Sequence, residues 1–202
     1  MFSPENNLIQ LKKDIRNKFS NLRKSISQQE REEKSNLIFD NFVKLFYDNH
    51  LKNYHQKKFS LYLPINNEVR TKKIEQFFIK NDIVFGYPKI TAKNMPLEFI
   101  KSSHNNNFIN SQFYKNLPEI NDNETIKPDI LIIPLLAFDK SLSRLGMGGG
   151  FFDRTIQHLR SQNSQLITIG LAYDFQEFDE LLPINNKDEK LNIVITNNEF
   201  FL

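Results

Sequence analysis

One short segment of the chain gathers the residue types that bind phosphate. Gly146, Gly148, Gly149 and Gly150 are four of the six glycines in the sequence and fall within five residues. Glycine accepts positive φ and lets backbone N–H groups approach a ligand without a Cβ in the way. A helix beginning just after Gly150 would add unpaired N–H donors and the positive end of its dipole. The segment therefore predicts an anion site, most often one for phosphate.

The residues around these glycines indicate which kind of anion site it would be. Arg144 and Arg154 flank the loop and can donate charge-assisted hydrogen bonds. Asp153 does not suit a bare phosphate, but it suits a site in which magnesium accompanies phosphates, because magnesium binds carboxylate and phosphate oxygens. The alternative is a flexible turn in which Asp153 only caps or favours the helix start. Phe151 stands where a glycine would complete G-x-G-x-x-G, and no Gly-Lys-Ser/Thr follows, so the two standard nucleotide loops are excluded.

The neighbouring patterns predict the elements that position this loop. Residues 130–136 form an apolar run of strand length, and Phe152, Ile156 and Leu159 recur at helical spacing after the glycines. Further strands are predicted around 59–63, 83–89, 97–100, 166–172 and 193–196, the last closing the sheet, and helices at 5–27, from 28 onward, and from Val69 to Ile79. Residues 101–127 predict a long surface loop. Residues 1–202 thus predict one three-layer α/β domain with a mostly parallel sheet and a basic N-terminal helix.

Charged residues far from the loop are ambiguous when taken alone. Lys12 and Arg16 are four residues apart, so they share one face of the N-terminal helix, either as a solvated basic stripe or as anion ligands. Glu68 follows a predicted strand at the start of a predicted helix. It lies either where α/β sheets bind ligands or in a first turn, where a carboxylate favours the helix dipole. Asp188 alone is one more loop acid.

The composition limits the classes of partner. The net charge of +3, with 25% charged residues, suits anionic small molecules and does not demand nucleic acid. The absence of cysteine fits a reducing compartment and excludes thiol chemistry. The first residues lack a signal pattern, and no apolar run reaches membrane-spanning length. We therefore expect a cytoplasmic protein without nucleic-acid or membrane partners, whereas the sequence does not predict an oligomeric state.

The segment Arg144–Arg154 reads Arg-Leu-Gly-Met-Gly-Gly-Gly-Phe-Phe-Asp-Arg and closely resembles the signature of the 5-formyltetrahydrofolate cyclo-ligase family, also called methenyltetrahydrofolate synthetase. The resemblance extends in order over nearly the whole chain, although only the glycine motif is highly specific. It implies a ligase of one-carbon metabolism that converts 5-formyltetrahydrofolate to 5,10-methenyltetrahydrofolate, with ATP as cosubstrate and magnesium required. The formyl oxygen would be phosphorylated by ATP, the substrate's own N10 would attack, and phosphate would leave, so that no protein nucleophile is needed.

The resemblance also implies residue roles. Lys12, Arg16 and Arg144 would hold phosphate oxygens, with Lys12 and Arg144 acting in catalysis, and the N-terminal helix would fold back over the nucleotide. Asp153 and Asp188 would hold magnesium, and Leu63 and Glu68 would contact the folate. The remaining nucleotide contacts would come from the loop, namely Leu145, Gly146, Met147, Gly148, Gly149, Gly150, Phe151 and Phe152. The chain departs from the family pattern at Met147, at Phe151 and Phe152, where tyrosines are common, and at Lys187, where a histidine often precedes the aspartate.

Two other functions stay open on the sequence. A sugar-phosphate isomerase-like enzyme would use a similar loop with a nearby base, although Lys12 and Arg16 favour a longer polyphosphate. A non-catalytic module that binds nucleotide or folate is permitted by Lys187 and the paired phenylalanines. The retention of Lys12, Arg144 and Asp153 argues against such a module.

Overall fold

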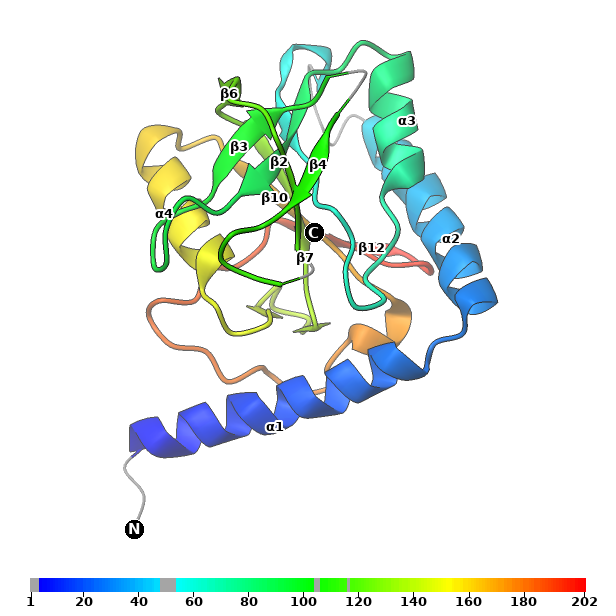
Figure 1. The fold of residues 1–202 in the computed structure, drawn as a ribbon. Helices are drawn as coiled ribbons and strands as arrows, with labels where there is room; N and C mark the ends of the chain where they lie inside the picture. Colours follow the sequence, from blue (N-terminus) through cyan, green and yellow to red (C-terminus); the bar gives the residue numbers. More distant parts are fainter. Residues whose placement is uncertain (1–3, 48–53, 104–105, 116) are drawn as a thin grey trace.

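The computed structural model describes residues 4–47, 54–103, 106–115 and 117–202, and its ribbon is shown in Figure 1. Among these residues, no helix is both long and apolar enough to cross a lipid bilayer. The elements are, in chain order, α1 (Pro4–Ser25), α2 (Gln28–Tyr47), the 3-10 helix η1 (Tyr54–Gln56), β1 (Phe59–Ser60), α3 (Lys72–Lys80), β2 (Phe85–Lys89), β3 (Glu98–Lys101), β4 (Phe108–Asn110), β5 (Pro118–Ile120), β6 (Thr125–Ile126), β7 (Ile130–Pro134), β8 (Ala137–Phe138), β9 (Arg144–Leu145), α4 (Phe151–Gln162), β10 (Ile167–Leu171), the 3-10 helix η2 (Asp174–Gln176), β11 (Ile193–Ile195) and β12 (Phe200–Phe201).

The main sheet is mixed but mostly parallel, as predicted. Its strand order is β12-β11-β10-β7-β1-β2-β3-β6. The pairs from β11 through β10, β7 and β1 to β2 are parallel, and the outer strands β12, β3 and β6 pair antiparallel. Consecutive parallel strands end at the same edge of the sheet, so the segments that leave β1, β7, β10 and β11 gather at one carboxyl edge.

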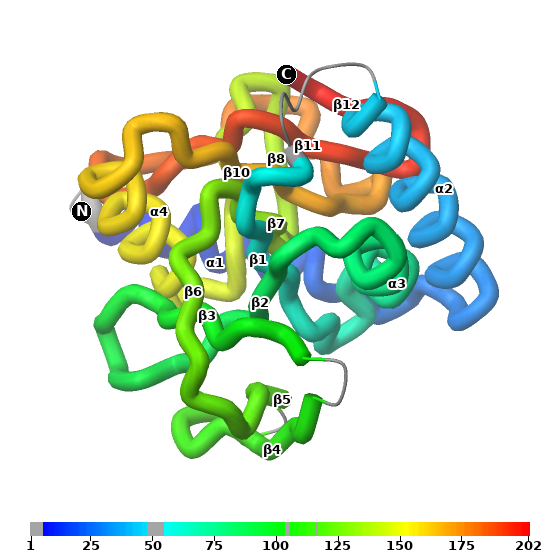
Figure 2. The backbone as a smooth tube through the Cα atoms, turned by 90° about the horizontal axis from the view of Figure 1, so that it is seen from above, coloured from blue at the N-terminus to red at the C-terminus, as the bar shows by residue number. Residues whose placement is uncertain are grey.

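Side chains of the central strand β7 show why helices cover both faces of this sheet. Ile130 and Ile132 belong to the apolar cluster formed with α2 and α3. Leu131 and Ile133 belong to a second cluster, formed with α4. Alternate residues of a strand point to opposite faces, so a run that is apolar throughout needs a cover on each side. Figure 2 shows the result, with α4 on one side of the sheet and α2 and α3 on the other. The predicted three-layer arrangement is confirmed.

Helix α1 lies outside these three layers and crosses the carboxyl edge of the sheet (Figure 1). Its residues Ile15 and Phe19 pack against Leu136, Ala137 and Leu145 of the β8–β9 hairpin. This hairpin directly precedes the glycine segment. The apolar stripe of α1 therefore brings its basic residues to the glycine segment.

Three local predictions were wrong. Residues 101–127 are not one long loop, because β4 and β5 pair as a hairpin and β6 joins the main sheet. All three β4 residues are exposed, so no apolar alternation marked that strand. Strand β11 does not close the sheet, since β12 pairs beyond it. Helix α3 begins at Lys72, and Val69 is buried in the connection that precedes it.

Replacement of Ser27 by alanine should lower the free energy of unfolding by about 1 kcal/mol, the usual value of a helix N-cap. The backbone N–H of Glu30 donates to Ser27 Oγ at 3.1 Å, which satisfies one donor of the first turn of α2. Urea unfolding of Ser27→Ala and of Ser25→Ala measures this. Ser25 Oγ only donates to the Leu22 carbonyl at the end of α1, so equal losses in the two variants would contradict the cap.

Candidate functional site at the carboxyl edge of the sheet

The glycine segment forms a turn between β9 and α4. At two positions the backbone of this turn has a conformation that favours glycine. Gly148 has φ of 99° and Gly150 has φ of 64°, both in the left-handed region. Gly150 is the N-cap residue of α4. A Cβ on Gly150 would lie 2.7 Å from Arg154 Nη1. The turn thus presents the N-terminus of α4 at the carboxyl edge of the sheet, which is the geometry of an anion site.

We expect Gly148→Ala to destabilise the fold by about 1–2 kcal/mol, because an L-residue is strained in the left-handed region. Gly146→Ala is the matched control. A Cβ at Gly146 meets nothing within 4 Å, and its φ is not positive, so its stability should be unchanged or slightly raised. Urea unfolding of both variants makes the comparison, and equal losses would show that the turn does not require positive φ at Gly148.

Asp153 does not cap the helix, although it lies in the first turn of α4, where a carboxylate favours the helix start. The N-cap of α4 has no side-chain hydrogen bond. Instead, Asp153 Oδ1 accepts a hydrogen bond from Arg144 Nη2 at 2.9 Å and another from the backbone N–H of Glu189 at 3.1 Å. Arg144 Nη1 also donates to the Glu189 carbonyl. Arg144 and Asp153 therefore join the glycine turn to the loop that precedes β11.

Lys12 and Arg16 are not a solvated stripe, because both reach the same region from α1. Lys12 is only 7% exposed, and its Nζ forms an ion pair with Asp188 Oδ2. Arg16 is half-buried, and its Nε donates to the Gly146 carbonyl at 2.9 Å. Asp188 Oδ2 also accepts from the backbone N–H of Asn185 at 2.6 Å. Lys12 and Arg16, near the start of the chain, thus meet Asp188, near its end, around the glycine turn.

The charges at this edge form two cation–carboxylate pairs, Lys12 with Asp188 and Arg144 with Asp153. Burial lowers the pKa of the Arg144 guanidinium from its ordinary value, and the charge of Asp153 opposes this shift. The hydrogen bonds and ion pairs described above use one oxygen of each carboxylate. A ligand with two or three negative charges could therefore bind Lys12 and Arg144, while a divalent metal bound the carboxylates of their present partners.

A magnesium ion fits this donor set. Among the described residues, no three His, Cys, Asp or Glu side chains form a metal-binding group. Magnesium does not need such a cage, since it is commonly held by one or two carboxylates together with substrate phosphates. Asp153 and Asp188 supply two carboxylates beside the glycine turn and the N-terminus of α4. Lys187, where the family often has histidine, is exposed.

Glu68 and Leu63 lie on the connection between β1 and α3. The first-turn interpretation of Glu68 is wrong, because α3 begins at Lys72. Glu68 is buried, and its Oε2 accepts from the backbone N–H of Ile65 at 3.0 Å. Burial raises the pKa of Glu68, while the Ile65 N–H and the charge of Arg23 oppose the rise. Leu63 is half-buried and packs against the core formed with α2 and α3. This packing does not bring Leu63 to the glycine turn.

The apolar residues of the motif point in different directions. Leu145 packs under α1, and Phe152 packs into the core beneath α4. Phe151 is half-buried, with the Tyr114 ring edge-on at 5.8 Å and the Arg154 guanidinium 4.9 Å from its centroid. Met147 is exposed. Of the two phenylalanines, Phe151 is the one that borders the exposed part of the turn.

Two residues near the site were not assigned from the sequence. Tyr114 comes from the β4–β5 hairpin, whose strands gave no apolar pattern, so no sequence signal placed it against Phe151. Arg23 is buried and contacts both Glu68 and Met147. Its signal was available, because Arg23 lies two turns beyond Arg16, on the face of α1 that carries Lys12.

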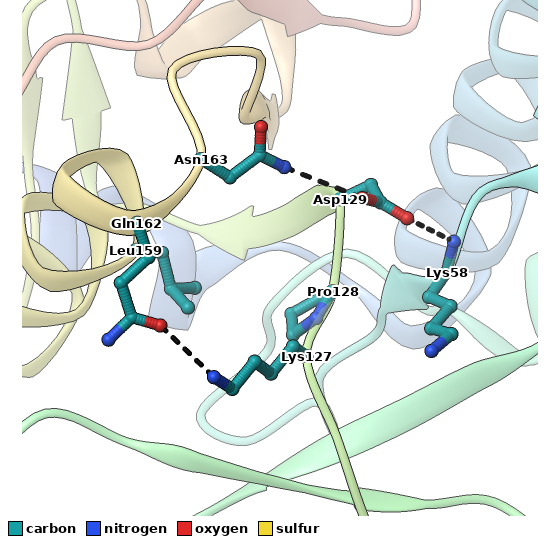
Figure 3. Close-up of a pocket in the computed structure, with 7 residues that line it drawn as sticks. All are labelled: Lys58, Lys127, Pro128, Asp129, Leu159, Gln162 and Asn163. Carbon is teal, nitrogen blue, oxygen red and sulfur yellow. Dashed lines mark hydrogen bonds between the residues drawn. The ribbon is translucent and has the colours of Figure 1, made fainter.

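A cavity of about 310 Å³ lies elsewhere, at the amino edge of the sheet (Figure 3). Asp129, just before β7, accepts there from the Lys58 backbone N–H at 2.9 Å and from Asn163 Nδ2 at 3.4 Å. Lys127 Nζ donates to Gln162 Oε1 at 3.3 Å. These contacts tie the starts of two strands to the end of α4, at the edge opposite the glycine turn, and we do not assign them to the reaction.

The fold and the site together define a class, namely α/β proteins with a glycine-rich turn and a helix N-terminus at the carboxyl edge of a mostly parallel sheet, completed by basic residues from a separate N-terminal helix. Comparison with known proteins narrows this class to one family. Residues 8–197 match the model of the 5-formyltetrahydrofolate cyclo-ligase family, and the chain belongs to that family.

Relatives and solved structures agree with this assignment. The 5-formyltetrahydrofolate cyclo-ligase of Haemophilus influenzae is 35% identical over 129 residues, which cover 62% of this chain and 68% of the relative. That of Mycoplasma genitalium is 35% identical over 144 residues, covering 70% and 73%. The structure of a 5,10-methenyltetrahydrofolate synthetase from Mycoplasma pneumoniae aligns with a TM-score of 0.70 at 27% identity, over 92% of this chain and 98% of the other. The Aquifex aeolicus synthetase aligns with a TM-score of 0.75 at 24% identity over 95% and 92%, and supports the fold. The chain is therefore an enzyme of the cyclo-ligase family, and the isomerase-like and non-catalytic alternatives are set aside.

Proposed function

We propose that residues 1–202 form one domain that catalyses the ATP- and magnesium-dependent cyclisation of 5-formyltetrahydrofolate to 5,10-methenyltetrahydrofolate, with release of ADP and phosphate. The observation that carries the proposal is the meeting of Lys12, Arg16, Arg144, Asp153 and Asp188 around the glycine turn. Cations, carboxylates and a helix N-terminus in one place match a magnesium-bound polyphosphate.

The nucleotide would lie between α1 and the glycine turn. Lys12 and Arg16 would bind phosphate oxygens from the α1 side, and the backbone of residues 146–150 would bind them from the α4 side. Arg144 would bind the transferred phosphoryl group, and its planar guanidinium suits that oxyanion. Asp153 and Asp188 would hold magnesium, which neutralises the charge of the phosphates when it is bound.

The folate would occupy the side of the turn that faces Glu68 and Phe151. Glu68 would accept hydrogen bonds from the pterin, and Leu63 would contribute an apolar wall. Phe151, already bordered by Tyr114, would offer a ring face for stacking. The roles of Leu63 and Glu68 rest on the resemblance to the family, and Glu68 is also linked to the glycine turn through Arg23, which contacts Met147.

The chemistry then requires alignment and charge stabilisation more than covalent participation of the protein. The formyl oxygen attacks the γ-phosphorus of ATP, and the bond to ADP breaks. N10 of the substrate attacks the formyl carbon and loses its proton. The carbon–oxygen bond to phosphate then breaks, which leaves the methenyl bridge between N5 and N10. Arg144 and Lys12 would stabilise the negative charge on the phosphoryl group during the first and last steps.

The proposal is tested by mixing the purified protein with 5-formyltetrahydrofolate and following the near-UV absorbance of methenyltetrahydrofolate. We expect the absorbance to rise only when ATP and magnesium are both present. An absorbance rise that is independent of ATP, or a flat trace despite ATP binding, would overturn the proposal.

A further inference from the structure

Arg23 is a buried cation that the proposed reaction does not yet use. It lies near the end of α1 and is 2% exposed. Its Nη1 donates to the Leu135 carbonyl at 3.2 Å, just beyond the carboxyl end of β7, and its Nη2 lies 3.7 Å from Met147 Sδ in the glycine turn. Its Nε is buried without a hydrogen-bond partner among the described residues.

Burying an unsatisfied donor lowers stability, and a buried ion pair is weak evidence for stability by itself. An apolar side chain of similar volume would fill the same space. The presence of an arginine here therefore calls for a reason other than packing.

The contact between the Arg23 guanidinium and Glu68 offers such a reason. Arg23 Nη1 is 3.8 Å from Glu68 Oε1, while Glu68 Oε2 is held by the Ile65 N–H. The same connection is tied to α1 a second time, because Asn67 Nδ2 donates to the Arg23 carbonyl at 3.2 Å. Arg23 and Glu68 form an ion pair at a distance longer than a hydrogen bond. Glu68 Oε1 is thus held beside a positive charge without a direct hydrogen bond from it.

Resting on the proposed function, we infer that Arg23 is a positioning residue for the folate subsite, which holds the Glu68 side chain in place while its own guanidinium is fixed between β7 and the glycine turn. Arg23 would act on the folate through Glu68 and not through the nucleotide. Two other groups face Glu68. Arg31 of α2 donates from Nε and Nη2 to the Glu68 backbone carbonyl at 3.0 and 2.9 Å, and the Tyr62 hydroxyl donates to the Val69 carbonyl at 3.1 Å.

The direction of the pH effect follows from these groups. Burial raises the pKa of Glu68, and the charges of Arg23 and Arg31 hold it down. Loss of the Arg23 charge should raise the Glu68 pKa further, so that the carboxylate is lost at a higher pH. The KM for 5-formyltetrahydrofolate should therefore begin to rise at a higher pH in Arg23→Gln than in the wild type as the pH is lowered.

The test compares wild type, Arg23→Gln, Arg23→Lys, Glu68→Gln and the double variant Arg23→Gln/Glu68→Gln, with KM and kcat for both substrates measured across pH. We expect Arg23→Gln to raise the folate KM about tenfold or more, the scale of one charge-assisted contact, and to change the ATP KM less than twofold. Arg23→Lys keeps the charge and should restore much of the folate KM. The double variant should be no worse than Glu68→Gln alone, because the two residues act as a unit.

Additive losses in the double variant, or equal rises of the folate and ATP KM values, would overturn the inference. If Arg23→Gln does not fold, Arg23→Lys and Glu68→Gln still decide it. The inference requires a raised folate KM in Glu68→Gln and a folate KM close to the wild-type value in Arg23→Lys, so an unchanged folate KM in Glu68→Gln would overturn it. Lys101→Gln, which removes an exposed surface pair with Glu124, is the control and should behave as wild type. A wild-type protein without turnover would instead refute the proposed function, so the two failures are distinguishable.

Discussion

Asp153→Asn should reduce kcat by at least about a hundredfold, the scale seen when one group aimed at developing charge is removed, while the protein stays folded. The carboxylate is the proposed magnesium ligand, and an amide cannot replace its charge. The fold should survive because asparagine keeps an oxygen that can accept from Arg144 Nη2 and from the Glu189 N–H.

The measurement is kcat as a function of magnesium concentration, with thermal unfolding of the same preparations. Asp40→Asn is the matched control, since Asp40 is exposed on α2, away from the glycine turn. Near-normal kcat in Asp153→Asn at ordinary magnesium would remove Asp153 from the metal site and leave it as a structural partner of Arg144.

Lys12→Ala should raise the KM for ATP by about ten- to a hundredfold, which corresponds to the loss of one hydrogen bond to a charged group. Lys12 is nearly buried and is fixed at the carboxyl edge by the packing of Ile15 and Phe19 on the β8–β9 hairpin. Its charge is therefore held in place before ATP arrives, so little ordering entropy is lost on binding.

The neighbouring residue offers a close control. Lys13 is exposed, and Lys13→Ala should leave the ATP KM unchanged. Initial rates over a range of ATP concentrations, at saturating folate, separate the two variants. If Lys12→Ala and Lys13→Ala had the same ATP dependence, Lys12 would be only the ion-pair partner of Asp188.

The strands and helices with strong patterns were predictable from the sequence. Residues 130–134 and 167–171 were predictable as buried strands, because both faces of the sheet are covered and their sequences are mostly apolar. The helix after Gly150 was predictable for a similar reason, since Ile156 and Leu159 recur at the spacing of one buried stripe. The β4–β5 hairpin was not predictable, because all three residues of β4 are exposed and no apolar alternation marks that strand.

The site was predictable only in part. The glycine turn was predictable, because four glycines within five residues indicate a backbone conformation that favours glycine. The positive φ of Gly148 and Gly150 confirms this. The pairing of Lys12 with Asp188 joins residues 176 positions apart, and no local pattern encodes such a distance. Only the family resemblance placed them in one site. The position of Arg23 on the Lys12 face of α1 could be predicted, but its contacts with Glu68 and Met147 could not, since they depend on how α1 crosses the sheet edge.

The route of the formyl oxygen tests the central claim most directly. The protein would be given 5-formyltetrahydrofolate carrying oxygen-18 in the formyl group, with unlabelled ATP and magnesium, and the released phosphate would be analysed by mass spectrometry. Phosphorylation of the formyl oxygen predicts that one labelled oxygen appears in each molecule of phosphate formed. Unlabelled phosphate, with the label recovered in water, would show that ATP is hydrolysed apart from the cyclisation and would contradict the mechanism.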